Sequence, residues 1–273
     1  MGKEKIKRTI VGRFIIKKLL GYIALIYILM ALFAYFFSDR LIFFPRRPGY
    51  TDSGEIIKIK TEDGAKISAM YFPNADAKFT ILYSHGNAED IGDLHKLFEM
   101  FNRNGFSVFA YDYHGYGTSE GKPSEKNAYR DVEAAYNYLV GELKTPPSRI
   151  IALGRSVGGG AATHIASWQK IAGLILESSF ITAFRVVTYL PLLPFDKFRN
   201  IAKIKNVRCP VLVIHGKADK IIPFRHGEKL FATANEPKFK LWVDGAGHND
   251  LVWVADGSYW NGIRRFANTI DSN

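Results

Sequence analysis

The chain has 273 residues, of which 47% are hydrophobic and 23% charged, and this composition suits one large α/β domain with a sizeable core. Of the net charge of +11, residues 1–18 carry +6 (seven Lys/Arg and one Glu), which leaves only +5 for the rest of the chain. With no nucleic-acid-binding motif, this uneven distribution excludes nucleic acid as an expected partner. The one cysteine, Cys209, excludes an intramolecular disulfide and is expected to be a small buried side chain.

An uncharged, strongly apolar segment covers residues 19–37 and follows the basic tail 1–18. As a helix it spans about 28 Å, close to the thickness of the bilayer core, and this predicts a single transmembrane anchor. The rival is a cleaved signal peptide, but no small-x-small cleavage site follows Phe37. Because basic flanks stay in the cytoplasm, we expect a cytoplasmic N-terminus and a main domain on the outer, periplasmic or lumenal, side.

After a linker at residues 38–54, strand and helix signals alternate through a domain at 55–273. Short apolar runs alternating with helical stretches predict an α/β fold with a mostly parallel eight-stranded sheet and helices on both faces. The first two strands lack an intervening helix, so we expect an antiparallel hairpin at the sheet edge. The expected strands are 55–61, 66–71, 79–84, 106–111, 149–153, 173–176, 211–214 and 239–243. The expected helices are 90–104, 124–143, 157–168, 224–233 and 258–269. Residues 178–205 interrupt this pattern with a long apolar stretch broken by two prolines, and they are expected to form a small cap.

The strongest chemical signal is Gly154-Arg155-Ser156-Val157-Gly158, placed between an expected strand and an expected helix. This is the G-x-S-x-G pattern of a nucleophile elbow, in which glycines leave room for a strained turn that exposes the serine above the sheet. The bland alternative is a glycine-rich turn with an incidental serine. The context favours Ser156 as a nucleophile.

A serine hydroxyl needs a base to take its proton and an acid to orient that base. Asp219 lies just past the strand at 211–214, and His248 lies in the glycine-rich loop after the last strand, which gives the chain order Ser, Asp, His. Asp219 could instead cap a helix or form a turn, and Glu177 is the rival acid. For most of the other histidines a structural role is the simpler interpretation.

Two backbone N–H groups are expected to form an oxyanion hole. One belongs to Val157, next after the nucleophile, and the other to Asn87 in the loop that follows the strand at 79–84. Asp112, Gly115 and Gly117 are interpreted as turn and helix-entry residues rather than catalytic ones.

Together these blocks resemble the α/β-hydrolase superfamily and, within it, the Bem-like membrane-anchored hydrolases. The resemblance covers residues 40–270 and rests on Phe-Phe-Pro at 43–45, His-Gly-Asn-Ala-Glu-Asp at 85–90, Tyr-Asp-Tyr-His-Gly-Tyr-Gly at 111–117, Gly-Arg-Ser-Val-Gly-Gly at 154–159 and Gly-His-Asn-Asp at 247–250. His114 departs from the arginine expected there. The resemblance implies ester or thioester hydrolysis without metal or cofactor, and the chain is also similar to serine aminopeptidases of the same superfamily.

The expected substrate is an acyl ester or thioester of lipidic character, met at the membrane surface. The apolar cap supplies the reason, since Tyr189, Leu192, Leu193 and Phe195 could line an acyl channel. Plain packing of this segment on the sheet is an equal alternative. A peptidase or small-ester hydrolase with soluble substrates, and an inactive protein that binds through the cap, are the competing functions. The sequence leaves the oligomeric state unknown.

Overall fold

The computed structural model describes residues 2–52 and 54–271, which divide into two compact units between Leu41 and Ile42. The first unit belongs to one helix, α1 (Gly2–Ile42), which continues through residues 38–42, where the sequence suggested a linker. No proline interrupts the chain until Pro45, and the residue before a proline is disfavoured in a helix, so α1 ends shortly before it. Residues Arg13–Ile42 are long and apolar enough to cross a membrane, a property that a signal sequence near an N-terminus would share.

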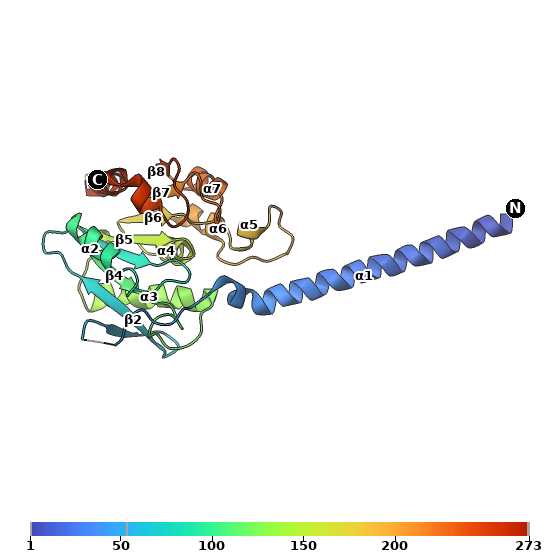
Figure 1. Ribbon diagram of the computed structural model, residues 1–273, viewed down its shortest axis with the longest axis horizontal. Helices are drawn as coiled ribbons and strands as arrows, with labels where there is room; N and C mark the ends of the chain where they lie inside the picture. Colours follow the sequence, from blue (N-terminus) through green and yellow to red (C-terminus); the bar gives the residue numbers. More distant parts are fainter. Residues whose placement is uncertain (1, 53, 272–273) are drawn as a thin grey trace. The chain divides into compact units, whose positions relative to one another are not determined.

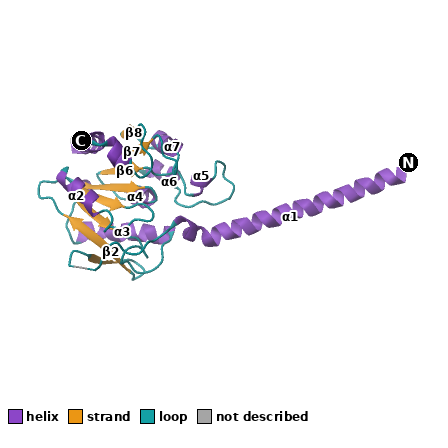
Figure 2. Ribbon diagram, viewed as in Figure 1, coloured by secondary structure: helices purple, strands orange, loops and turns teal. Residues whose placement is uncertain are grey.

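The second unit contains an eight-stranded sheet in the order β1-β2-β4-β3-β5-β6-β7-β8. β1 pairs with β2 and β2 with β4 in antiparallel fashion, while the remaining pairs are parallel. The α/β fold predicted from the sequence is therefore confirmed (Figures 1 and 2), and the strand pairings also confirm the antiparallel edge hairpin. The strands are β1 (Ile57–Lys60), β2 (Lys66–Phe72), β3 (Thr80–Ser84), β4 (Ser107–Tyr111), β5 (Ile150–Arg155), β6 (Gly173–Glu177), β7 (Val211–Gly216) and β8 (Lys238–Val243).

Helices cover both faces of this sheet, because successive side chains of its central strands point to opposite sides. Leu82 of β3 joins one apolar cluster with residues of α3 and α4, whereas its neighbours Ile81 and Tyr83 join a second cluster with residues of α2 and α9. The longer helices are α2 (His95–Arg103), α3 (Glu125–Gly141), α4 (Gly158–Ala166), α7 (Arg225–Thr233) and α9 (Gly257–Asp271). The shorter ones are η1 (Pro147–Arg149), α5 (Phe184–Val187), α6 (Asn200–Lys203), η2 (Ile204–Asn206) and α8 (Leu251–Ala255).

The predicted cap lies between β6 and β7 and contains α5, α6 and η2. Its base is closed by Asp196, which accepts hydrogen bonds from the Thr182 hydroxyl (2.6 Å) and from the amide of Phe184 (2.9 Å). The amide of Ala183 also donates to the carbonyl of Lys197 at 2.8 Å. The residues between these contacts therefore form a loop whose two ends are tied together.

Candidate active site

Ser156 occupies a sharp turn between β5 and α4. Its φ of +55° lies in the left-handed region, which is strained for a residue with a side chain. The turn needs the flanking glycines: a Cβ on Gly154 would come within 2.4 Å of the Gly158 carbonyl oxygen, and a Cβ on Gly158 within 2.0 Å of the Ser84 carbonyl oxygen. The start of α4 therefore approaches β5 at Gly154 and the end of β3 at Gly158, which explains why glycine stands at both positions around the serine.

The structure brings Ser156, His248 and Asp219 together beyond the carboxyl ends of β5, β8 and β7. The Ser156 hydroxyl lies 3.1 Å from Nε2 of His248, and Nδ1 of the same ring lies 2.7 Å from Oδ2 of Asp219. Serine, imidazole and carboxylate thus form a continuous hydrogen-bonded chain in the order that nucleophilic catalysis requires.

Asp219 is held by the backbone as well as by His248. Its Oδ1 accepts hydrogen bonds from the amides of Ile221 (2.9 Å) and Ile222 (2.8 Å), which leaves Oδ2 for the imidazole. Burial alone would raise the pKa of this carboxyl, but the hydrogen bond and charge of His248 and the Ile222 amide outweigh it and lower the pKa. Nε2 of His215 lies 3.5 Å from Oδ2 of Asp219, and burial lowers the pKa of His215, so this ring favours the neutral form near pH 7.

The rival acid, Glu177, has other partners. Its Oε2 accepts a 2.6 Å hydrogen bond from the Tyr259 hydroxyl, and its Oε1 lies 3.5 Å from Nε of Arg155. The geometry places Asp219, and not Glu177, against the imidazole.

The two predicted oxyanion donors lie at the start of α4 and in the loop after β3. Val157 is the N-cap residue of α4, and Asn87 follows β3. Neither amide N–H has a recorded acceptor among the residues that the structure describes. Both N–H groups are therefore available to an external oxygen. The Asn87 side chain is itself hydrogen-bonded: its Oδ1 accepts from the Tyr116 hydroxyl (2.6 Å) and from the amide of Ala88 (3.0 Å), among others.

Arg155 is a functional candidate that the sequence reasoning missed. Its guanidinium pairs with Glu89 and Glu177, and its Nη2 donates to Oδ1 of Asn249 (2.9 Å) and to the carbonyl oxygen of His248 (3.3 Å). One side chain thus ties the nucleophile turn to the Asn87 loop, which contains Glu89, and to the His248 loop. The sequence does contain an arginine inside the Gly154–Gly158 motif and a glutamate in the loop at 85–90. Their spacing in the chain gives no sign that the two side chains pair.

Asp112 and the nearby glycines stabilise the loops around the site. Oδ2 of Asp112 accepts a 2.6 Å hydrogen bond from Tyr50, and Oδ1 accepts from the amide of Ile91 at 3.0 Å. Gly115 and Gly117 have φ values of +74° and +50°, and a Cβ on Gly117 would come within 1.9 Å of the Asp112 carboxylate. These contacts fit the turn role expected from the sequence.

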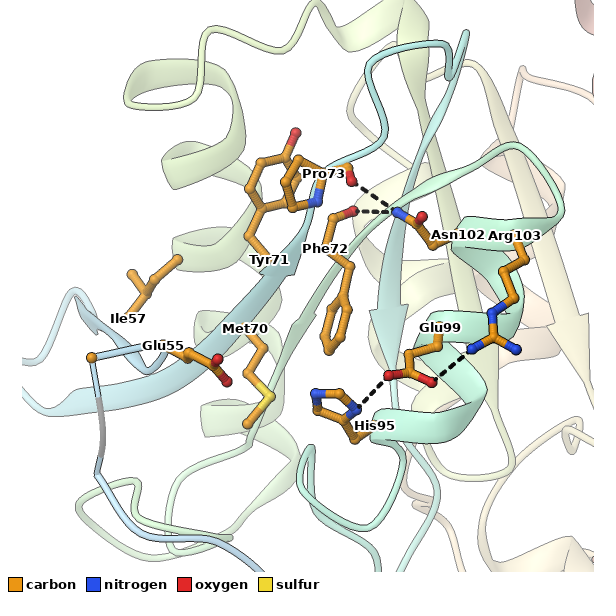
Figure 3. A pocket seen from close by; sticks show the side chains of 11 residues that line it. Glu55, Ile57, Met70, Tyr71, Phe72, Pro73, His95, Glu99, Asn102 and Arg103 are labelled. Atoms are coloured by element: carbon orange, nitrogen blue, oxygen red, sulfur yellow. Dashed lines mark hydrogen bonds and ion pairs between the residues drawn. The ribbon is translucent and has the colours of Figure 1, made fainter.

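The predicted cap residues divide into two groups. Tyr189 and Leu192 are exposed (77% and 57%), whereas Leu193 and Phe195 are half-buried. Two of the four side chains are therefore mostly exposed to solvent, and an acyl channel lined by all four stays a prediction. The wide groove in Figure 3, of about 660 Å³, lies elsewhere, between β2 and α2, where Glu99 pairs with His95 and Arg103.

Within 2–52 and 54–271, no group of three His, Cys, Asp or Glu side chains is placed to hold a metal ion.

Comparisons of the sequence and of the structure with known proteins all find hydrolases. Residues 75–198 match the family described as serine aminopeptidase, S33. The chain is 38% identical over 223 residues to human alpha/beta hydrolase domain-containing protein 17B, covering 79% of this chain and 75% of the human protein. A Pyrococcus furiosus esterase has a similar structure (TM-score 0.69, 20% identity, 82% of this chain and 98% of that chain). So does a soluble variant of monoglyceride lipase from Saccharomyces cerevisiae (TM-score 0.64, 19% identity, 81% and 96%). The resemblance noted in the sequence is therefore confirmed, and the chain belongs to the α/β-hydrolase superfamily.

Proposed function

We propose that this protein is a membrane-anchored serine hydrolase that cleaves carboxylic ester or thioester bonds of acyl, lipidic substrates. The observation that carries the proposal is the hydrogen-bonded chain from Ser156 through His248 to Asp219. Each of these side chains has the partner that its role needs, and no metal or cofactor takes part in the reaction that they support.

In the first half of the reaction, the Ser156 hydroxyl attacks the carbonyl carbon while Nε2 of His248 takes its proton. Asp219 stabilises the resulting imidazolium through the Nδ1–H hydrogen bond. The carbonyl oxygen becomes an oxyanion, which accepts hydrogen bonds from the amides of Val157 and Asn87. The intermediate then expels the alcohol or thiol, which takes the proton from His248 and leaves an acyl ester on Ser156.

The second half repeats these steps with water. His248 takes a proton from the water as it attacks the acyl ester, the same two amides stabilise the oxyanion, and Ser156 leaves with the proton from His248. The products are the carboxylic acid and the free enzyme.

Three features support a lipidic substrate. The helix segment Arg13–Ile42 suits a membrane span. The chain reaches the site within a few residues of that segment, since Nδ2 of Asn87 donates to the carbonyl of Ile42 at 2.6 Å. Large apolar side chains, Tyr189 and Leu192 among them, are exposed on the cap.

The excess of positive charge before the span favours a cytoplasmic N-terminus and a catalytic unit on the outer side.

The decisive experiment is labelling with a fluorophosphonate, which reacts with activated serines. Wild type and Ser167→Ala, a change outside the site, should be labelled at equal rates, and Ser156→Ala should not be labelled. Equal labelling of Ser156→Ala would refute the assignment of the nucleophile. A folded wild type that resists the probe would favour the inactive binding protein.

Substrate class is tested separately with matched esters, thioesters and anilides. Long acyl chains should be turned over faster than acetyl esters if the substrate is lipidic. The family match to serine aminopeptidases supports a peptidase as the second candidate, and substantial turnover of peptide amides beside that of the matched esters would favour it.

A further inference from the structure

We propose that the rim of the active site docks on the lipid bilayer through Phe44 and the cap loop 187–192, so that substrate enters from the membrane. This proposal rests on the proposed function and adds to it the surface that meets the lipid. The first observation is the path of residues 42–44, here called the strap, which follow directly on the candidate span.

The strap is bonded to the loop that carries the predicted oxyanion donor. Nδ2 of Asn87 donates to the Ile42 carbonyl (2.6 Å), and the amide of Phe44 donates to Oδ1 of Asn87 (2.9 Å). The Tyr116 hydroxyl completes the contact, because it accepts from the same Phe44 amide at 3.0 Å while donating to Asn87. Both ends of the strap are therefore fixed to the edge of the catalytic site.

The strap also packs against the base of the cap. The Phe43 ring is 4% exposed, and its centroid lies 5.8 Å from that of Phe198, which is fully buried. Phe198 in turn lies over α4, since a Cβ on Gly160 would come within 2.2 Å of its ring. The strap, the nucleophile helix α4 and the base of the cap thus meet at one cluster of aromatic side chains.

Beyond this base, the cap loop presents large apolar side chains to solvent. Val187, Tyr189, Leu190 and Leu192 are 82%, 77%, 69% and 57% exposed, and Phe44 is 54% exposed. Single exposed apolar residues are ordinary, but several within six positions of a loop indicate a surface that meets an apolar partner.

The surroundings of the loop are basic. The Arg225 guanidinium lies 4.3 Å from the centre of the Tyr189 ring, and Arg185 donates to the Tyr189 carbonyl at 2.6 Å. Arg46 and Arg47, just after the strap, are exposed. Apolar side chains with arginines beside them match the interfacial region of a membrane, where tails and anionic headgroups meet.

Chain continuity identifies the partner as the bilayer. The strap has three residues, which can reach at most about 11 Å when extended. Asn87 bonds the strap to the rim of the site. By chain length alone, this rim therefore lies within about 11 Å of the end of any span that finishes at Ile42. A lipid surface lies close to this rim wherever the span is embedded, whereas a protein partner would have to be recruited.

The test uses the full chain in lipid nanodiscs with an environment-sensitive fluorophore on a single introduced cysteine. Leu190→Cys and Val187→Cys report on the cap loop. Asp76→Cys, exposed in the segment that leads into the amino end of β3, is the matched control, because the site lies beyond the carboxyl ends of the parallel strands. Burial raises the pKa of Cys209 to about 12, so this thiol reacts slowly and the unsubstituted chain corrects for its labelling.

We expect spin-labelled lipids to quench the fluorophores at 187 and 190 at least about twofold more than the one at 76, because interfacial side chains lie within the headgroup boundary. Two loop positions are used so that poor folding of one variant leaves the other. Quenching by aqueous iodide that is equal at all three positions would overturn the proposal. Fluorophosphonate labelling of the same samples separates failure of the docking surface from failure of the proposed function. Protein that is labelled but does not contact lipid refutes only the docking surface. Protein that contacts lipid but is not labelled refutes only the hydrolase.

Discussion

Replacing Arg155 by methionine should destabilise the catalytic unit and slow its reaction with a phosphonate probe. The Arg155 side chain is 11% exposed, and its partners Glu177 and Glu89 are 2% and 21% exposed. Breaking a buried ion pair by removing one partner costs 3–5 kcal/mol, and the partial exposure of Glu89 places this case near the lower end, at about 3 kcal/mol. For a unit of this size, that corresponds to a fall in Tm of about 6–12 °C.

The Tm is measured by circular dichroism, and the labelling rate at a temperature well below it. Arg155→Lys should lie between wild type and Arg155→Met, because lysine keeps the charge but cannot reach the same set of acceptors. Arg130→Met is the matched control: its partners Glu62 and Asp63 are 77% and 31% exposed, so it should cost less than about 1 kcal/mol. Arg155→Met with a Tm within about 1 °C of wild type would refute this reasoning.

Three further predictions follow from the same geometry. Asp219→Asn should lower kcat about 10⁴-fold in steady-state kinetics and leave KM within a few-fold of wild type, because it removes the carboxylate acceptor that orients His248. A much smaller loss of kcat would mean that another acid serves this role. Gly158→Ala should lower the free energy of unfolding in urea by more than about 3 kcal/mol, because the new Cβ would meet the Ser84 carbonyl. The control Gly141→Ala has open space around it and should be neutral or slightly stabilising. Burial lowers the pKa of His114, but the hydrogen bonds and charges of Asp131 and Asp63 outweigh it and raise the pKa above 6.5. The contribution of His114 to stability is therefore fully present below pH 6.5 and is lost as the pH rises through its folded pKa. Unfolding in urea at about pH 6 and about pH 9 should show this loss, and the loss should be smaller in His114→Asn.

Most of the strands were predictable because they are short apolar runs bounded by polar or turn-forming residues, while β1 (Ile57–Lys60) alternates apolar and charged residues. The expected runs at 79–84 and 106–111 correspond to β3 and β4, although β4 lies between β2 and β3 in the sheet. That order depends on contacts between strands far apart in sequence, and hydrophobic periodicity carries no information on it. The ends of α1 and α2 were less accurate for a related reason, because local propensity alone does not fix where a helix frays or turns.

The candidate site was predictable where a residue's role follows from its place in the chain. Ser156 sits in a pattern that only a tight turn explains, and Asp219 and His248 each follow a strand of the same sheet. Arg155 and the side chain of Asn87 were not found, because their roles depend on where a side chain points across a gap between loops. Their bonds to the His248 loop and to the Ile42 carbonyl exist only after the sheet has brought those loops together.

The cap illustrates the same limit and gives it a functional meaning. An apolar loop between β6 and β7 was expected to cover the site, yet the side chains of Tyr189 and Leu192 are directed to solvent. Composition cannot distinguish an apolar loop that closes over a substrate from one that meets an external apolar phase. The strap makes the difference, because Phe43 packs on the base of this loop and the candidate span ends one residue earlier. In a chain built this way, the loop can be exposed in the isolated unit and still be covered where the protein works, with the bilayer taking the place of a packed lid.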